Sequence, residues 1–145
     1  MTIAIEKTSW QDAEQELREI RTRVFIDEQR VPETLEWDGE DAQSTHFLAR
    51  SSDGTAVGCI RLMPSGQLSR LSVLEPYRNQ GIGSALLATA EEEARVAGMT
   101  EVFLHAQTHA TSFYESAGFV VNGGIFMEAD IPHRQMYKEV AAETH

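Results

Sequence analysis

Arg78-Asn79-Gln80-Gly81-Ile82-Gly83-Ser84 is the stretch that decides the fold, because it joins an apolar run, Leu68 to Leu74, to a strongly helical segment. An apolar run of this length predicts a strand. The two glycines carry no side chains, so backbone N–H groups near them can approach a ligand closely. N–H groups at a helix start also lack intrahelical partners and lie at the positive end of the helix dipole. The stretch therefore predicts an anion site, suited to a pyrophosphate, beside the positive charge of Arg78.

The size and charge of the chain restrict its class. A length of 145 residues fits one domain of ordinary size, and we expect a single domain over residues 1–145. The formal net charge of -11 argues against binding of nucleic acid or an anionic membrane. It favours cationic or neutral partners, with solubility alone as the open alternative.

The cysteine content and the apolar runs indicate the compartment. Cys59 is the only cysteine, so no internal disulfide can form and a reducing compartment is expected. It lies in the apolar run 56–60, which predicts a small buried side chain rather than a catalytic thiol. No apolar stretch is long enough to cross a bilayer and the N-terminus shows no signal sequence, so we expect a soluble cytoplasmic protein.

Strand and helix patterns alternate along the chain. A polar stretch over 28–44 is expected to form a loop or a broken helix. The element order predicts an α/β or α+β fold, with a sheet of about six to seven strands and helices on both faces. The expected strands are 2–6, 46–50, 55–63, 67–74, 101–106, 119–129 and 133–140, and the expected helices are 10–27, 81–97 and 109–117.

Three kinds of glycine-rich phosphate loop compete for the motif at 78–84. A Walker A loop needs Lys and then Ser or Thr after its last glycine, but Ser84-Ala85 follow Gly83, so this class is excluded. A dinucleotide-binding loop needs a third Gly or Ala and an acidic residue closing the next strand. Position 86 is Leu and the next strand ends in His105-Ala106-Gln107, which makes the dinucleotide class a weak match.

The remaining pattern, Arg-x-x-Gly-x-Gly after a strand, resembles the acetyl-CoA-binding motif of the Gcn5-related N-acetyltransferase (GNAT) family. A second block, Phe113-Tyr114-Glu115-Ser116-Ala117-Gly118-Phe119, matches the Tyr-x-x-x-Gly-Phe signature one strand further on in that family. Three further segments, 21–29, 36–41 and 128–133, look like the ElaA-like branch, so the resemblance covers nearly the whole chain. Two positions depart from it: Gln107 replaces a frequent Asn, and Asp130 replaces a frequent Gly.

The resemblance implies a mixed, splayed sheet and acetyl-CoA as co-substrate. The backbone of Leu71, Ser72 and Val73 would bind the pantetheine arm as an added strand does, with the Val73 N–H polarising the thioester carbonyl. Gln107 would help to hold the amides of the cofactor. The pyrophosphate would be held by Arg78, Asn79, Gln80, Gly81, Ile82, Gly83 and Ser84.

In the family that the chain resembles, an amine attacks the thioester directly. Tyr114 is the expected general acid for the leaving thiolate; a core tyrosine packed between Phe113 and Phe119 is the alternative. A general base is also needed, because an alkylamine of pKa about 10 is mostly protonated at neutral pH. The candidates for this base are Glu28, Glu128 and His133. Each has a structural alternative: a solvated helix end for Glu28, a charge at a strand edge for Glu128, and a polar strand residue for His133.

The acceptor is the least determined part of the function. Trp37 and Asp38 lie in an acidic segment that predicts either a pocket wall selecting a cation or, for the tryptophan, an anchor of the loop on the core. The histidines at positions 46, 105, 109, 133 and 145 show no close metal-binding spacing, so no metal site is expected.

The sequence therefore predicts a cytoplasmic N-acetyltransferase that acts on a primary amine of a small molecule or peptide. The alternatives are a non-catalytic acyl-CoA-binding or regulatory module and a dinucleotide-binding domain. A homodimer formed by the final strands across a two-fold axis stays open.

Overall fold

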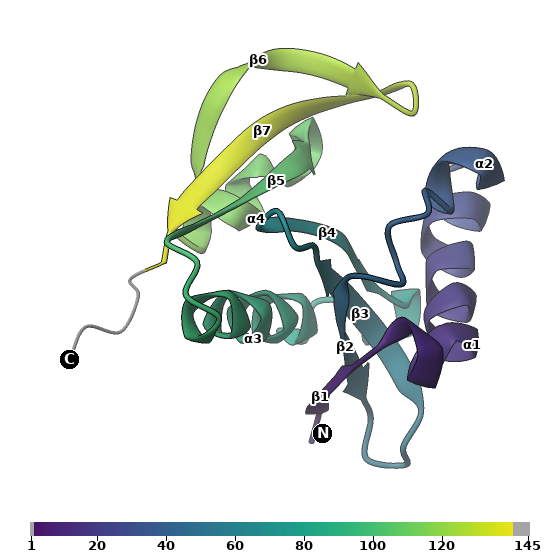
Figure 1. Ribbon diagram of the computed structural model, residues 1–145. Helices are drawn as coiled ribbons and strands as arrows, with labels where there is room; N and C mark the ends of the chain where they lie inside the picture. The colour runs from purple at the N-terminus through teal and green to yellow at the C-terminus, as the bar shows by residue number, and fades with distance from the viewer. Residues whose placement is uncertain (1, 141–145) are drawn as a thin grey trace.

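The computed structural model describes residues 2–140, and within them seven strands form one sheet in the order β1-β2-β3-β4-β5-β7-β6 (Figure 1). Neighbouring strands run antiparallel except β4 and β5, which are parallel, so the sheet is mixed as expected. The strands are β1 (Ala4–Thr8), β2 (Thr45–Arg50), β3 (Ala56–Leu62), β4 (Gln67–Val73), β5 (Glu101–Gln107), β6 (Val120–Glu128) and β7 (Ile131–Glu139).

Helices cover both faces of the sheet, which confirms the predicted architecture (Figure 1). The first helix begins where expected, because the Ser9 hydroxyl accepts a hydrogen bond from the Asp12 N–H at 3.2 Å. The helical segments are α1 (Trp10–Arg21), the π-helix η1 (Thr22–Glu28), α2 (Glu33–Glu36), η2 (Glu75–Tyr77), α3 (Ile82–Val96), η3 (Thr108–Ala110) and α4 (Thr111–Ser116).

Two apolar cores lie on opposite faces of the sheet. Alternation along β2 supplies both of them: Phe47 and Ala49 join the core under α3, and Leu48 joins the core under α1. Cys59 is 1% exposed in the α1 core, and burial raises the pKa of its thiol to about 11. The thiol is therefore a buried apolar group, as the sequence predicted, and not a nucleophile.

The sheet divides between β4 and β5. These strands pair only at Gln67–Phe103 and Leu68–Leu104, and beyond that point they separate. In Figure 1 the group β5, β7 and β6 turns away from β1 to β4. On its other edge β4 carries a bulge, because Ser69 pairs with Arg61 and Ser72 pairs with Cys59, leaving two residues opposite one. The opening lies beside the end of β4 and confirms the predicted splay.

The end of the first helix differs from the sequence prediction. The helix expected over 10–27 is an α-helix only to Arg21 and continues as the π-helix η1, in which the Gln29 N–H bonds the Val24 carbonyl at 3.1 Å. A short π-helical segment of this kind is frequent at functional sites. No helix in the range 2–140 is long and apolar enough to cross a membrane.

Candidate active site

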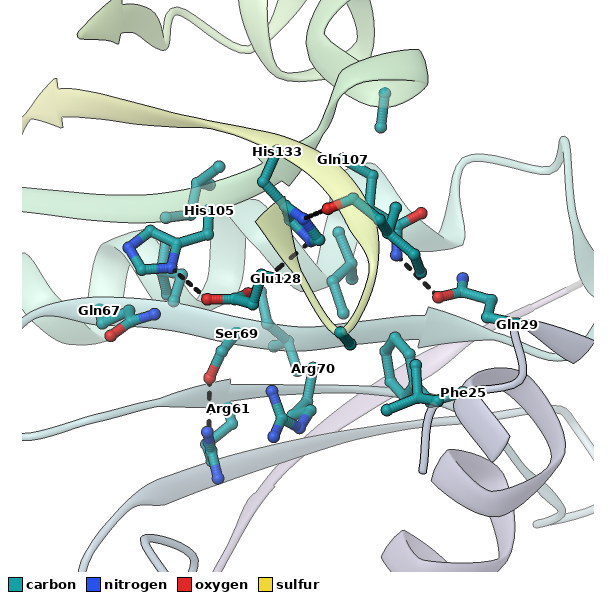
Figure 2. A pocket seen from close by; sticks show the side chains of 18 of the residues that line it. Phe25, Gln29, Arg61, Gln67, Ser69, Arg70, His105, Gln107, Glu128 and His133 are labelled. Carbon is teal, nitrogen blue, oxygen red and sulfur yellow. Dashed lines mark hydrogen bonds and ion pairs between the residues drawn. The ribbon is translucent and has the colours of Figure 1, made fainter. Parts of the chain in front are cut away.

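The opening between β4 and β5 forms a pocket of about 440 Å³ (Figure 2). Its walls come from many parts of the chain: η1 and the following segment through α2, then β3, β4, Leu87 of α3, β5 with η3 and α4, and the β6–β7 hairpin. Both apolar and charged side chains line it, among them Phe25, Leu71, Arg70, Tyr114 and Glu128. Segments far apart in the sequence therefore share one cavity.

The start of α3 has the geometry of an anion site. Gly81 is the N-cap, with φ 81° and no side-chain cap, and the first helical bond is donated by Ala85 to the Gly81 carbonyl. The N–H groups of residues 82–84 precede that bond and have no intrahelical partner. A Cβ at Gly81 would meet no atom within 4 Å, and one at Gly83 would lie 3.6 Å from Phe113, an ordinary contact. Packing within the chain does not fill this cradle, so it fits an approaching pyrophosphate.

Arg78 joins the end of β4 to the end of η1. Its Nε donates to the Val73 carbonyl at 2.8 Å, and its Nη2 donates to Glu28 at 2.8 Å. The guanidinium is thus fixed in place, but one of its forks already holds a carboxylate. Asn79, next in the loop, has φ 64°, a left-handed conformation that asparagine tolerates better than most residues.

The end of β4 offers an open backbone edge to the pocket. Because pairing with β5 stops at Leu68, the edge of Leu71 to Val73 that faces β5 has no neighbouring strand among residues 2–140. Leu71 lines the pocket, whereas Ser72 is buried and its hydroxyl lies 3.2 Å from the Cys59 sulfur. An extended chain could pair with this edge as an added strand.

Tyr114 in α4 faces the same pocket. Its ring packs edge-on against Phe113 and Phe119, with centroid distances of 5.0 and 6.0 Å. Burial raises the pKa of its phenol to about 12. The phenol is therefore protonated at neutral pH. No side chain or backbone group of the described residues hydrogen-bonds its hydroxyl, so the O–H group can donate a hydrogen bond to a ligand.

Glu128, at the end of β6, lies between two histidines (Figure 2). Glu128 Oε1 is 3.0 Å from Nδ1 of His105, and its Oε2 is 3.7 Å from Nε2 of His133. The hydrogen bond from His105 lowers the pKa of Glu128, so the carboxylate is ionised at neutral pH. His133 Nδ1 donates to the Ile131 carbonyl at 2.7 Å, which leaves Nε2 able to accept a proton. Phe126 contacts both imidazoles.

A network of three arginines and three carboxylates supports the opposite wall, and four of its members, Glu36, Asp38, Arg61 and Arg70, line the pocket. Arg21 is 0% exposed and bonds Glu36 and Asp41 at 2.8 and 2.7 Å. Arg61 bonds Asp41 at 3.0 Å and Asp38 at 2.9 Å. Arg70, held at φ 58° in the bulge of β4, lies 3.0 Å from Glu36 and 3.3 Å from Asp38. The six formal charges cancel, so this wall is polar but neutral as a group.

Comparison with known proteins identifies the family. A family model described as an acetyltransferase (GNAT) domain matches residues 9–140. The chain belongs to the GNAT acetyltransferase family. It is 36% identical over 131 residues to the uncharacterized protein YyaT of Bacillus subtilis (strain 168), across 87% of this chain and 88% of YyaT. It is 33% identical over 123 residues to the uncharacterized N-acetyltransferase YjcF of the same strain, across 83% of this chain and 88% of YjcF.

Solved structures agree with this assignment to the GNAT family. The crystal structure of Escherichia coli ElaA is similar with a TM-score of 0.84 and 26% identity, covering 95% of this chain and 100% of ElaA. An acyl-CoA N-acyltransferase from Pseudomonas aeruginosa has a TM-score of 0.82 and 29% identity, covering 94% of this chain and 99% of that protein. The predicted membership in the GNAT family is confirmed, and these relatives support acyl transfer as the general class of activity.

The GNAT pocket brings together some of the predicted site residues and not others. It contains Tyr114, Glu128, His133, Gln107, Leu71 and Asp38 in its lining. Glu28 is not part of the lining and pairs with Arg78. Of the three base candidates, the pocket therefore contains Glu128 and His133.

The acidic segment 36–41 of this GNAT chain pairs with the chain's own arginines and does not form a simple pocket for a cation. Trp37 is not part of the pocket lining; its ring stacks on the guanidinium groups of Arg18 and Arg21, 4.7 and 5.0 Å away, which matches the anchor alternative. Asp38 does line the pocket, but it pairs with two arginines. Burial disfavours its ionised form, yet the hydrogen bonds from Arg61 and the charge of Arg70 outweigh this and lower the pKa of Asp38 to about 2.

The sequence analysis did not identify two groups of residues that line the pocket. His105 was not among the candidates, although it lies two residues before Gln107 on β5 and so on the same face of the strand. Gln29, Arg61 and Arg70 have no local signal of this kind. The described residues contain no cluster of His, Cys, Asp or Glu arranged for a metal ion, and His145 lies outside the described range.

Proposed function

We propose that this GNAT protein transfers the acetyl group of acetyl-CoA to a primary amine of a small molecule or peptide, by direct attack of the amine. The observation that supports the proposal most is the open β4 edge at Leu71 to Val73. It adjoins both the anion-binding start of α3 and a pocket that contains a proton donor, Tyr114, and proton acceptors, Glu128 and His133. An acyl transfer needs these three parts side by side.

The donor would bind along the end of β4. In this proposal the N–H groups at residues 82–84 and Arg78 hold the pyrophosphate, and the backbone of Leu71, Ser72 and Val73 pairs with the pantetheine arm. The Val73 N–H then polarises the thioester carbonyl and stabilises the negative charge that develops on its oxygen. Asn79, Gln80 and Ser84 are exposed at the rim of the loop and complete the proposed donor site.

Tyr114 is the proposed general acid. A phenol of pKa about 12 is protonated throughout the neutral range. Complete transfer of its proton to a thiolate, whose conjugate acid has a pKa of about 8.5, is uphill by about 5 kcal/mol. This is well below the barrier of about 16 kcal/mol for a turnover of about 10 per second. Tyr114 therefore donates a hydrogen bond as the carbon–sulfur bond breaks, transfers its proton to the sulfur, and regains a proton from water.

Glu128 and His133 are the proposed acceptors of the amine proton. Among the carboxylates that line the pocket, Glu36 and Asp38 pair with arginines, whereas Glu128 pairs with His105 and lies near His133. Glu128 is thus the carboxylate best placed to attract an ammonium group. Once Nε2 of His133 takes the proton, the neutral amine can attack, and the imidazolium is stabilised by Glu128.

A non-catalytic acyl-CoA-binding or regulatory module is the second candidate. The Arg78–Glu28 pair favours it, because a carboxylate held at the donor loop weakens the attraction for a pyrophosphate. A single domain, a cytoplasmic location and a homodimer stay predictions.

Release of free thiol from acetyl-CoA across a panel of primary amines tests the proposal. We expect amine-dependent release, with the N-acetyl product found by mass spectrometry. Tight binding of acetyl-CoA without turnover on any amine would instead support the module. Affinity for a nicotinamide or flavin dinucleotide and none for CoA would contradict both.

A further inference from the structure

Arg70 has an unusual backbone conformation in the wall of the pocket. Its φ is 58°, in the left-handed region, and it lies in the bulge where the pairing of β4 with β3 shifts. A long side chain is rarely held in this conformation, because the Cβ atom crowds the backbone. Such strained residues persist where their surroundings hold them, and they occur often at functional sites.

The contacts of the Arg70 guanidinium lie on one side. Its Nε is buried and is 3.0 Å from Glu36 Oε2, although no hydrogen bond of good geometry forms there. Its Nη2 donates to the Glu36 carbonyl at 3.1 Å, to Asp38 Oδ2 at 3.3 Å and to the Leu35 carbonyl at 3.4 Å. These contacts fix the plane of the guanidinium.

The remaining nitrogen of Arg70, Nη1, is left for a ligand. It makes no hydrogen bond to any group of residues 2–140, and unlike Nε it is not buried. It carries two N–H donors. Arg70 lines the pocket and its side chain is 21% exposed. The pocket wall therefore contains a charged donor that is held in place and unused by the chain.

The charges around Arg70 favour a neutral oxygen as the partner of Nη1. Glu36 and Asp38 already balance its charge, within a network that is neutral as a group. The hydrogen bond from His105, together with charges that include Arg70, lowers the pKa of Glu128, so a further carboxylate lies within electrostatic range. A ligand carboxylate would add a negative charge without a counterion, whereas a carbonyl oxygen accepts from Nη1 without that cost.

Glu128 and Arg70 thus offer two different contacts in one cavity (Figure 2). We propose that Arg70 is a specificity-determining residue, whose Nη1 binds a neutral carbonyl oxygen next to the amine that reacts, while Glu128 attracts the ammonium form of that amine. The acceptor is then an aminoacyl amide, either a small amino-acid amide or the first residue of a peptide. This inference rests on the proposed acetyl transfer and names its substrate class.

Matched acceptors test the inference in the wild type. Leucinamide and isoamylamine share a branched alkyl chain, and only leucinamide carries a carbonyl group. We expect a higher kcat/KM for leucinamide, and a lower value for leucine, in which a carboxylate replaces the amide. A leucyl tripeptide amide separates the two sources: a kcat/KM above that of leucinamide assigns the acceptor to peptides, and one below it to small amides.

Arg70→Lys separates recognition of the carbonyl group from the different basicity of the two amines, because each amine is the same in both proteins. Lysine keeps a positive charge beside Glu36 and Asp38 but lacks the planar fork that directs a second nitrogen into the pocket. The ratio of kcat/KM for leucinamide to that for isoamylamine should fall by about tenfold. Arg23→Lys, at an exposed position outside the pocket lining, should keep the wild-type ratio.

An unchanged ratio in Arg70→Lys would overturn the inference, and so would a wild type that does not prefer leucinamide to isoamylamine, a result that needs no variant to fold. A preference for leucine would also overturn it, because Arg70 would then bind a carboxylate. If no amine is acetylated, titration of the same amines in the presence of CoA distinguishes the two proposals. Tighter binding of leucinamide that is lost in Arg70→Lys would retain the subsite without the proposed function, and equal binding would overturn both.

Discussion

The proposed donor end and acceptor end of the site are built in different ways. The proposed donor end, from Leu71 to Ser84, adjoins the pocket, and Leu71 alone of these residues lines it; it is one continuous strand, loop and helix start, and it offers mainly backbone groups to a ligand. The acceptor end is assembled from side chains that are distant in the sequence, such as Arg21 with Asp41 and His105 with Glu128. A backbone anion site needs only local geometry, whereas a side-chain site needs the whole fold to bring its charges together.

The difference has a consequence for stability. The proposed donor end contains a glycine cradle and the ion pair Arg78–Glu28, whose side chains are 36% and 35% exposed. The acceptor end rests on ions such as Arg21 and Glu36, which are at most 2% exposed. Buried ion pairs are costly to break, because the remaining charge is left without compensation. Variants at the two ends should therefore fail in different ways.

The largest effect is expected from Arg21→Met, which disrupts the buried network of three arginines and three carboxylates. The substitution leaves Glu36 and Asp41 buried with too little positive charge, and it should lower the free energy of unfolding by about 3–5 kcal/mol. Urea unfolding measures it. Arg23→Met, which removes an exposed pair with Glu19, is the control and should change stability by less than about 1 kcal/mol. Similar stability of the two variants would show that the buried network does not hold this end together.

The next effect separates chemistry from binding at the donor end. Tyr114→Phe keeps the ring packing against Phe113 and Phe119 but removes the proton donor, so kcat should fall by about a hundredfold. The affinity for acetyl-CoA should stay nearly unchanged in a direct titration. Tyr137→Phe, outside the pocket lining, is the control. Normal turnover in Tyr114→Phe would remove its role as general acid.

The same network should also make the free energy of unfolding depend on pH, through Asp38. The folded-state pKa of Asp38 is lowered from an ordinary 3.8 to about 2. Its contribution is present above the ordinary value and is lost as the pH falls toward 2, and it amounts to about 1–2 kcal/mol after solvent screening. Urea unfolding as a function of pH should therefore be less steep over this window in Asp38→Asn. Asp27→Asn, at an exposed position, should keep the wild-type slope, and equal slopes in all three proteins would contradict the expectation.

The smallest effect distinguishes two candidates for the general base, Glu128 at the acceptor end and Glu28 beside the proposed donor loop. Glu128→Gln should lower kcat/KM by about tenfold, because His133 remains to take the proton but loses the nearby carboxylate. Glu28→Gln should keep the acidic limb of the pH–rate profile, since its carboxylate is engaged with Arg78 outside the pocket lining. Loss of that limb in Glu28→Gln alone would move the base to the donor end.

The sequence predicted most of the fold, because local patterns determine it. Alternation along β2 separates Phe47 from Leu48, the Ser9 cap starts α1, and glycines mark turns such as Gly54, which has φ 87°. It did not predict where α1 becomes a π-helix, since that change depends on hydrogen bonds such as Gln29 to Val24. The family resemblance correctly implied the splay between β4 and β5, which composition and periodicity do not reveal.

By itself, the sequence determined the local elements of the proposed donor end of this GNAT protein: a strand, a glycine loop and a helix start whose N–H groups lack intrahelical partners whatever the rest of the chain does. Only the tertiary structure decided which candidates share the acceptor end. It placed Glu128, His133 and His105 in one cluster, paired Asp38 with arginines, and brought Gln29 to Gln107. The physical reason is range: backbone groups are positioned by their neighbours in the chain, whereas charges and side-chain amides are positioned by partners that only folding brings near.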